Sequence, residues 1–372
     1  MQYSTFAAID IGSYDVILEI FEISKKQGIR SVDKICHRME LGKDTYTLGK
    51  IRPEMEEELC RVLADFVRIM EGYRVDDYRA TASSAISEAS NSLYVLGKIH
   101  QLTGLSVTVL SNSEQRFLSY KALAAMEDNF NKIIEKGTAI LDLDGGSFQI
   151  SLFDKDALVT TQNIRMGSLR IRERLAGIQS ETEHYEEMVE ELIWNEVSSF
   201  KKMYLKDRKI ENIMLIGDVF TDSVYQNIEE KTTKIISREN FNTWYEKIIR
   251  QSPMELAVKL GIPLENASLM YPSAVIYKCL IDMMGAEHIW IPGVHMTRGI
   301  AYEYAEQMKL LKGGHNFEND ILMAAKNIGK RYAVNRPHVQ NLEMTALAMF
   351  DATKKMHGMK ERERLLLQMA VM

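Results

Sequence analysis

The chain has 372 residues, of which 46% are hydrophobic and 26% are charged, and its formal net charge is −6. This length is enough for two or three domains with their own cores, and the composition is that of a globular protein rather than a disordered one. The negative net charge argues against a general nucleic-acid binder, which needs a basic surface, so we expect no nucleic-acid partner.

The cysteines, Cys36, Cys60 and Cys279, are odd in number and far apart, with no C-x-x-C pair. This spacing predicts free thiols in a reducing compartment, and we expect the protein to be cytoplasmic. The N-terminus goes straight into a strand with no basic segment before it, which is not the pattern of a signal peptide. No run of about 18 apolar residues occurs, so no membrane span is expected.

Apolar runs and their periodicity predict the elements of the first half, and the second strand shows clear alternation. Strands are expected at Phe6–Ile11, Val16–Ile23, Ser31–Leu41, Tyr78–Ala82 and Ser106–Leu110, and helices at Pro53–Met70, Ala85–Gln101 and Ser113–Met126. This β-α-β-α order predicts a mixed sheet with helices packed on it.

The second half repeats this plan. Strands are expected at Thr138–Asp142, Gln149–Phe153, Leu158–Arg165, Asn212–Ile216 and His288–Ile291, and helices from Ser168, near Glu181–Tyr204, over most of 217–285 and from Thr297. Beyond Phe317 the pattern is helical only. It is still apolar where the chain stops, which suggests a third domain of which only part is present.

Each half contains a hairpin in which a strand ends in an aspartate, a Gly-Ser turn follows and a second strand leaves. The first hairpin carries Asp10, Gly12 and Ser13, and the second carries Asp142, Asp144, Gly145, Gly146 and Ser147. Glycines allow backbone N–H groups to approach an anionic ligand with no Cβ in the way. Two such hairpins predict two related half-domains that present phosphate-binding turns to a shared cleft. The alternative is a pair of ordinary hairpin turns, each capped by its own aspartate.

The order of the motifs resembles the exopolyphosphatase / guanosine pentaphosphate phosphohydrolase (Ppx/GppA) family. The matching segments, with the family motifs, are Ala8 to Asp15 (A-x-D-x-G-S-N-S), Ala82 to Asn91 (A-T-S-A-L-R-E-A-x-N), Leu110 to Leu118 (I-S-G-x-E-E-A-R-L), Asp142 to Gln149 (D-I-G-G-G-S-T-E) and Met166 to Arg174 (M-G-x-x-R-L-x-E-R). The helical tail resembles the start of the HD-like domain of longer members.

This resemblance implies an α/β fold with two actin-like domains of the sugar kinase/actin ATPase, ribonuclease H-like class around a cleft, followed by part of an all-α HD-like domain. The expected boundaries are 1–127, 128–303 and 304–372. The implied activity is release of terminal phosphate from polyphosphate or guanosine pentaphosphate with Mg²⁺ or Mn²⁺. The resemblance also suggests a homodimer.

The resemblance assigns the cation to Asp10 and Asp142, and Asp144, which has no acidic counterpart in the family motif, is a possible further ligand. Phosphate binding falls to Gly12, Ser13, Gly145, Gly146, Ser147 and Ser87. The catalytic positions are Gln115 and its neighbour Glu114. Glu114 could replace a missing base, but adjacent helical residues point about 100° apart, so it is also explained as a first-turn acid that favours the helix dipole.

The positions at which this chain differs from the family motifs lie mainly at the expected active site. Gln115 stands for a glutamate, and an amide cannot accept a proton from water and become neutral as a carboxylate does. Ser87 stands for a phosphate-binding arginine, and Asp144 stands for a glycine. A carboxylate at Asp144 would repel a phosphate unless a divalent cation lay between them.

Two main hypotheses follow. The first is a weakened phosphoanhydride hydrolase in which Gln115 orients the attacking water. The second is a non-catalytic regulator that binds polyphosphate, an alarmone of the guanosine tetraphosphate type or a nucleotide. An actin-like ATPase or sugar kinase is a third reading, from which the motifs point away. The run Arg165, Arg170, Arg172 and Arg174 is either a basic rim for a polyanion or a solvated helix face.

Overall fold

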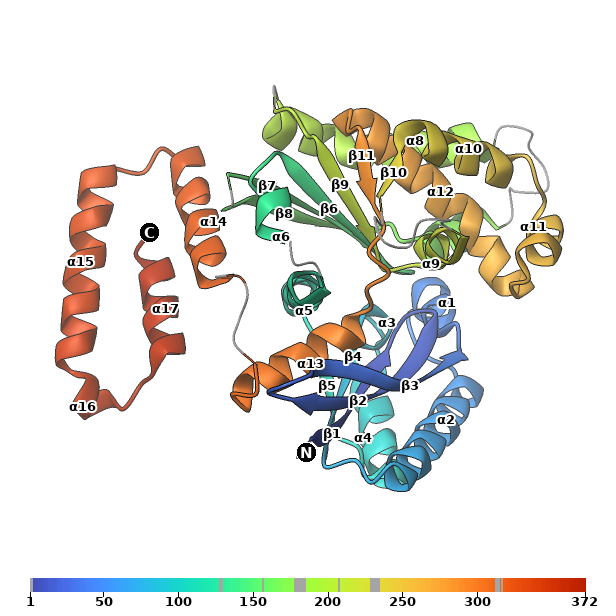
Figure 1. Cartoon of the computed structure of the whole chain (residues 1–372), viewed down its shortest axis with the longest axis horizontal. Helices are drawn as coiled ribbons and strands as arrows, with labels where there is room; N and C mark the ends of the chain where they lie inside the picture. The colour runs from blue at the N-terminus through green and yellow to red at the C-terminus, as the bar shows by residue number, and fades with distance from the viewer. Residues whose placement is uncertain are drawn as a thin grey trace.

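The structure is a computed structural model that describes residues 3–126, 130–155, 157–176, 185–206, 208–227, 235–311, 315 and 317–372. Two α/β units lie one above the other, and a group of C-terminal helices stands to one side of them (Figure 1). This arrangement confirms the expected actin-like fold with a C-terminal helical part. Within these ranges no helix is both long and apolar enough to cross a bilayer.

The first sheet has the strand order β3-β2-β1-β4-β5. Its strands are β1 (Ser4–Ile11), β2 (Asp15–Ser24), β3 (Gly28–Arg38), β4 (Asp77–Ala82) and β5 (Val107–Val109). The first three strands are antiparallel neighbours, β4 runs parallel to β1, and β5 runs parallel to β4. The helices of this unit are α1 (Leu41–Leu48), α2 (Pro53–Gly72), α3 (Ser84–Ser87) and α4 (Ser92–Thr103).

The second sheet has the order β10-β11-β9-β6-β7-β8. Its strands are β6 (Thr138–Leu143), β7 (Phe148–Asp154), β8 (Ala157–Ile164), β9 (Asn212–Ile216), β10 (Ile235–Ser237) and β11 (His288–Trp290). The run β8-β7-β6-β9-β11 has the same pairing directions as β3-β2-β1-β4-β5. The repeat expected from the two hairpins is therefore present, with β10 added at the edge.

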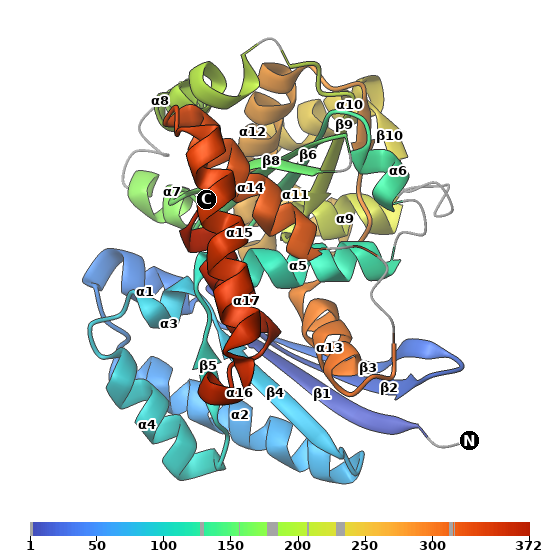
Figure 2. The same ribbon diagram turned by 90° about the vertical axis from the view of Figure 1, so that its left-hand side faces the viewer.

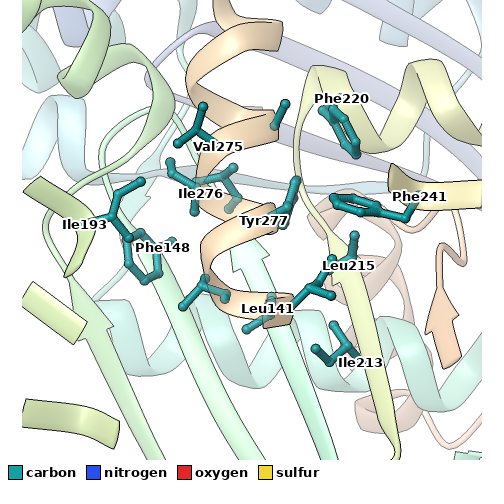
Figure 3. Packing of buried hydrophobic residues seen from close by; sticks show 14 of the residues in the cluster. Leu141, Phe148, Ile193, Ile213, Leu215, Phe220, Phe241, Val275, Ile276 and Tyr277 are labelled. Carbon is teal, nitrogen blue, oxygen red and sulfur yellow. The ribbon is translucent and has the colours of Figure 1, made fainter. Parts of the chain in front are cut away.

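The core of the second unit forms around one helix. Its helices are α7 (Ser168–Leu175), α8 (Tyr185–Phe200) with a π-helical turn η1 (Lys201–Leu205), α9 (Val219–Asn227), α10 (Arg238–Ile249), α11 (Pro253–Leu260) and α12 (Leu264–Met284). Tyr277 and Ile276 of α12 pack against Leu141 and Leu215 of the sheet and against Phe241 of α10 (Figure 3). Burial of these side chains contributes a stabilising free energy of roughly 25 cal/mol per Å² of apolar area. This energy stabilises the second sheet, which carries the second turn.

Two helices lie between the sheets: α5 (Asn112–Met126), which the short α6 (Phe130–Ile134) follows, and α13 (Met296–Gln307) (Figure 1). Because α13 packs on β1, β2 and β3 as well as on α5, β2 is covered on both faces despite its alternating sequence. Glu19 of β2 is consequently buried, and its carboxylate accepts hydrogen bonds from Ser31 and Thr297.

The C-terminal helices, which lie in front of the two units in Figure 2, are α14 (Phe317–Arg331), α15 (Arg336–Ala352), α16 (Lys354–His357) and α17 (Glu361–Ala370). Of these, only α14 makes extensive contact with the body, at β8. The expected domain boundary at 303/304 falls inside α13, and the boundary at 127/128 lies outside the described residues. The expected start of a helix near Glu181 also lies outside them.

Three local predictions were wrong. Residues 41–48 form α1, which was not expected, and residues 235–237 form β10 within a region expected to be helical. The helix expected at 85–101 is two helices, α3 and α4, separated at residues 88–91. The side chain of Asn91 bonds both backbone groups of Ile51, and this contact from a distant segment interrupts the helix.

Candidate functional site

A cavity of about 330 Å³ lies where the two glycine turns meet, and residues of both units line it. Its acidic lining residues are Asp10, Asp15, Asp142, Asp144, Asp218 and Asp222. Its basic lining residues are Lys34, Arg38 and His295. Acidic side chains therefore outnumber basic ones in the lining, and Lys34 and Arg38 of β3 supply its positive charge, because burial lowers the pKa of His295 and favours its neutral form.

The first turn exposes only one of its two predicted phosphate-binding residues to this cavity. Gly12 lines it, and its N–H donates to the carbonyl of Asp15 at 2.8 Å. Ser13 is fully buried, does not line the cavity, and bonds the hydroxyls of Tyr46 at 2.7 Å and Ser84 at 3.2 Å. The Ser13 hydroxyl thus joins the turn to α1 and α3.

In the second turn, too, some of the predicted site residues line the cavity and others do not. Asp144 and Gly145 line the cavity, whereas Gly146 and Ser147 do not. The N–H of Asp144 donates to the carbonyl of Ser147 at 2.9 Å, which closes the turn, and the Asp144 carboxylate accepts the N–H of Gly145. The N–H that was expected to cradle an external anion therefore already has an anionic partner.

The two turns pack directly against each other instead of facing one another across a gap. A Cβ on Gly145 would lie 3.3 Å from the Cβ of Ser13, and a Cβ on Gly146 would lie 2.1 Å from the hydroxyl of Tyr46. No room for a phosphate remains between the turns at this contact. The space for a ligand lies beside the turns, where Asp10, Gly12 and Gly145 reach it.

Burial raises the pKa values of the carboxyl groups at the turns. The pKa of Asp142 rises to about 6, against the opposing hydrogen bond from Ser119 at 2.7 Å. The pKa of Asp144 rises to about 7, because burial and the charge of Asp142 outweigh the backbone hydrogen bonds that it accepts. Burial also raises the pKa of Asp10 well above its usual value, with further increases from Asp15 and Asp144. Burial therefore favours the neutral form of these carboxyl groups, and neighbouring carboxylates add to the effect at Asp10 and Asp144.

The donor atoms at the acidic end suit a hard divalent cation. Asp10 Oδ1 is buried and has no hydrogen-bond partner, and the neighbouring donors are carboxylate oxygens, which Mg²⁺ and Mn²⁺ prefer. In the described part of the chain, no group of three or more acidic, histidine or cysteine side chains is close enough to hold a metal by itself. A cation here would therefore also need water and substrate oxygens as ligands.

Gln115 and Glu114, adjacent on α5, have different surroundings. Gln115 is 8% exposed and lines the cavity, and its Nε2 has no hydrogen-bond partner. Glu114 lies outside the cavity, and its carboxylate caps the helix by accepting the N–H and the hydroxyl of Ser111 at 2.8 and 2.7 Å, which lowers its pKa. Ser87 is exposed at the end of α3, outside the cavity.

The family model described as the Ppx/GppA phosphatase family matches residues 19–308. The chain belongs to this family. A bifunctional 3-dehydroquinate synthase/phosphatase of Fusobacterium nucleatum is 21% identical over 76% of this chain and 44% of its own length. Exopolyphosphatase 1 of Mycobacterium leprae is 25% identical over 38% of this chain and 41% of its own length. These alignments span less than half the length of either relative.

Solved structures of family members share the fold. An exopolyphosphatase from Cytophaga hutchinsonii superposes with a TM-score of 0.73 at 17% identity, covering 82% of this chain and 98% of that chain. A Ppx/GppA family member from Aquifex aeolicus superposes with a TM-score of 0.67 at 17% identity, covering 82% of this chain and 99% of that chain.

In this Ppx/GppA member two arginines of the predicted run, Arg170 and Arg172, form ion pairs between the units, whereas Arg165 and Arg174 are exposed. Arg172 pairs with Glu40 at 2.7 Å, and Arg170 pairs with Glu88 at 3.0 Å, so both residues connect α7 to the first unit. Arg170 also donates to the carbonyl of Gly146 at 2.8 Å and stacks 3.8 Å from the ring centre of Tyr46. These contacts hold the second turn against the first unit.

Several cavity residues were missed by sequence reasoning. Asp15, Asp222, Lys34 and Arg38 line the cavity but lie outside the motif positions to which function was assigned. Gln149, the last residue of the second motif, was given no role, yet it also lines the cavity, and its buried Oε1 has no partner. For β3 a signal existed, because residues 34, 36 and 38 alternate along one strand and share a face.

Proposed function

We propose that this Ppx/GppA member removes the terminal phosphate from a linear phosphoanhydride, either polyphosphate or guanosine pentaphosphate, at the cavity beside the two turns. The observation that carries the proposal is the meeting of Asp10, Asp142 and Asp144 with Gln115, whose Nε2 has no partner, in one cavity. Groups that bind a cation and a group that can hydrogen-bond a water are the parts that phosphoryl transfer to water requires.

Mg²⁺ or Mn²⁺, when bound, would neutralise phosphate oxygens at the acidic end. Gln115 would hydrogen-bond the attacking water and orient it toward the terminal phosphorus, because an amide can position a water that it cannot deprotonate. For a loose transition state this positioning supports slow turnover. We propose that the protein works in the cytoplasm, where its cysteines stay reduced, and as a homodimer.

The test is release of phosphate from polyphosphate and from guanosine pentaphosphate, measured with Mg²⁺, with Mn²⁺ and with a chelator. We expect slow, cation-dependent release from at least one of the two substrates. Absence of release from both, in protein that remains folded by circular dichroism and binds neither substrate, would contradict the proposal.

A second candidate is a non-catalytic regulator that binds polyphosphate or a guanosine tetraphosphate-type ligand. Gln115 favours it, since the amide that lines the cavity cannot deprotonate an attacking water. Tight binding of guanosine tetraphosphate or polyphosphate with no phosphate release from either substrate would select this function.

A further inference from the structure

Two positive side chains stand together on the β3 wall of the acidic cavity. Lys34, Cys36 and Arg38 alternate along β3 and all three line the cavity. Lys34 and Arg38 are exposed to solvent, so they lie on the open side of the cavity. The acidic residues Asp10, Asp142 and Asp144, by contrast, gather at the turns.

Neither cation has a carboxylate partner within the described residues. Arg38 lies opposite Asp15 and Lys34 lies opposite Glu19 in the pairing of β2 with β3, yet no ion pair forms at either position. One oxygen of Asp15 accepts instead from the thiol of Cys36 at 3.4 Å. The carboxylate of Glu19 accepts from Ser31 and Thr297.

Elsewhere around the site the positive groups are neutralised. Arg170 and Arg172 are both in ion pairs between the units. A cation that lines a cavity without such a pair is available to an anionic ligand. An arginine and a lysine offer complementary contacts, because the guanidinium forms a bidentate fork with phosphate oxygens and the ammonium acts as a compact charge.

We propose that Lys34 and Arg38 bind the part of the substrate on the leaving side of the scissile bond. This inference rests on the proposed function. The terminal phosphate lies at the acidic end, where a cation can shield it, and the rest of the chain runs outward along β3. This direction follows from the positions of the charged groups, with the carboxyl groups at the turns and the two cations on β3.

The positions of Lys34 and Arg38 also favour cleavage of the bridging P–O bond. Water adds to the terminal phosphorus, the bridging P–O bond breaks, and the bridging oxygen keeps the electron pair and leaves with the shortened chain. The proton lost by the water ends on the released phosphate. Charge develops on the leaving oxygen, and the two cations on that side stabilise it.

The experiment measures tripolyphosphate binding by calorimetry with Mg²⁺, together with phosphate release, for wild type, K34Q, R38Q and the double variant. Lys26, exposed in the β2–β3 turn and outside the cavity, supplies the matched control K26Q, which removes one charge from the same hairpin. We expect the double variant to raise Kd and KM about tenfold or more and to weaken their dependence on salt, because screened charge pairs are lost. R38K should retain part of the affinity, and K26Q should match wild type.

The outcomes separate this inference from the proposed function. If wild type releases phosphate and the folded double variant binds tripolyphosphate as tightly as wild type, the inference is overturned and the hydrolase stands. If wild type binds tripolyphosphate but releases phosphate from neither polyphosphate nor guanosine pentaphosphate, and the double variant loses binding, the binding role of Lys34 and Arg38 stands and the hydrolase fails. If wild type does not bind tripolyphosphate at all, the inference is overturned, and the hydrolase is decided by phosphate release from polyphosphate and guanosine pentaphosphate.

Discussion

The carboxylate of Asp144 accepts a hydrogen bond from the backbone N–H of Gly145, the residue that follows it. In a glycine turn this N–H is a donor for an external anion. Asp144 therefore supplies the turn with an anion from the chain itself, at a position where the family motif has glycine. The consequence is a site that is satisfied internally until Asp144 is protonated, displaced or bound to a cation.

Replacing Asp144 with glycine should strengthen anion binding. The Gly145 N–H becomes free and one repelling charge leaves the cavity, so we expect tripolyphosphate to bind about tenfold more tightly, roughly 1.4 kcal/mol. Asp144→Asn, which removes the charge but keeps an acceptor, should give a smaller gain. Calorimetry with Mg²⁺ measures both. Weaker binding in Asp144→Gly would show instead that Asp144 is needed to hold the cation.

Replacing Gln115 with glutamate should raise the rate of phosphate release. A carboxylate at this buried position can take the proton of the attacking water, and general-base catalysis contributes about 10²–10⁴-fold. The gain should grow with pH, because burial raises the pKa of a carboxyl group and only the ionised form is a base. Gln115→Ala, which can neither orient nor deprotonate a water, is the control and should be slower than wild type. A glutamate variant no faster than wild type would remove Gln115 from the mechanism.

Cation affinity should increase with pH across the range in which Asp142 and Asp144 ionise. Their pKa values are raised to about 6 and about 7, so both are protonated at pH 5 and ionised at pH 8. Protons compete with the cation at low pH. Titration with Mn²⁺, followed by calorimetry, should show weak binding at pH 5, a rise between pH 6 and 7 and a plateau near pH 8.

The same raised pKa values also make the free energy of unfolding depend on pH. A carboxyl whose pKa is higher in the folded state contributes stability at low pH that is lost as the pH rises through that folded value. Without a cation, the free energy of unfolding should therefore fall as the pH rises toward about 7. Mn²⁺ should offset this fall by roughly 1–3 kcal/mol at saturating concentration. In Asp142→Asn, Mn²⁺ should raise the free energy of unfolding by less than in wild type. An equal increase would show that the cation binds elsewhere.

Replacing Gly146 with alanine should destabilise the contact between the two turns. The new Cβ would lie 2.1 Å from the hydroxyl of Tyr46 and 2.5 Å from that of Ser84. We expect a loss of about 1–3 kcal/mol in the free energy of unfolding, as for other overpacked sites. Adding Tyr46→Phe should restore part of the loss, because the nearest atom of that ring would then be 2.9 Å away.

Gly72→Ala is the control for this pair. Gly72 lies at the end of α2, and its Cβ would meet nothing within 4 Å, so thermal unfolding should be unchanged or shifted slightly upward. Equal losses in Gly146→Ala and Gly72→Ala would contradict the packing of the turns described above.

Local sequence determined the elements around the turns. The strands on either side of Asp10 and Asp142 follow from apolar runs ended by glycine, and they were predicted to within one or two residues. The break between α3 and α4 was not predictable in this way. It depends on Asn91 meeting Ile51, 40 residues away, and no local pattern encodes such a contact.

The sequence by itself determined the fold family, the repeated hairpins and the presence of acidic residues at their turns, because these depend on neighbours along the chain. Only the tertiary structure decided which face of each turn meets the cavity. One face of the first turn packs through Ser13 against Tyr46, so the other face, which carries Gly12, lines the cavity. The same holds for Lys34 and Arg38, whose relation to distant carboxylates exists only after the two units fold against each other.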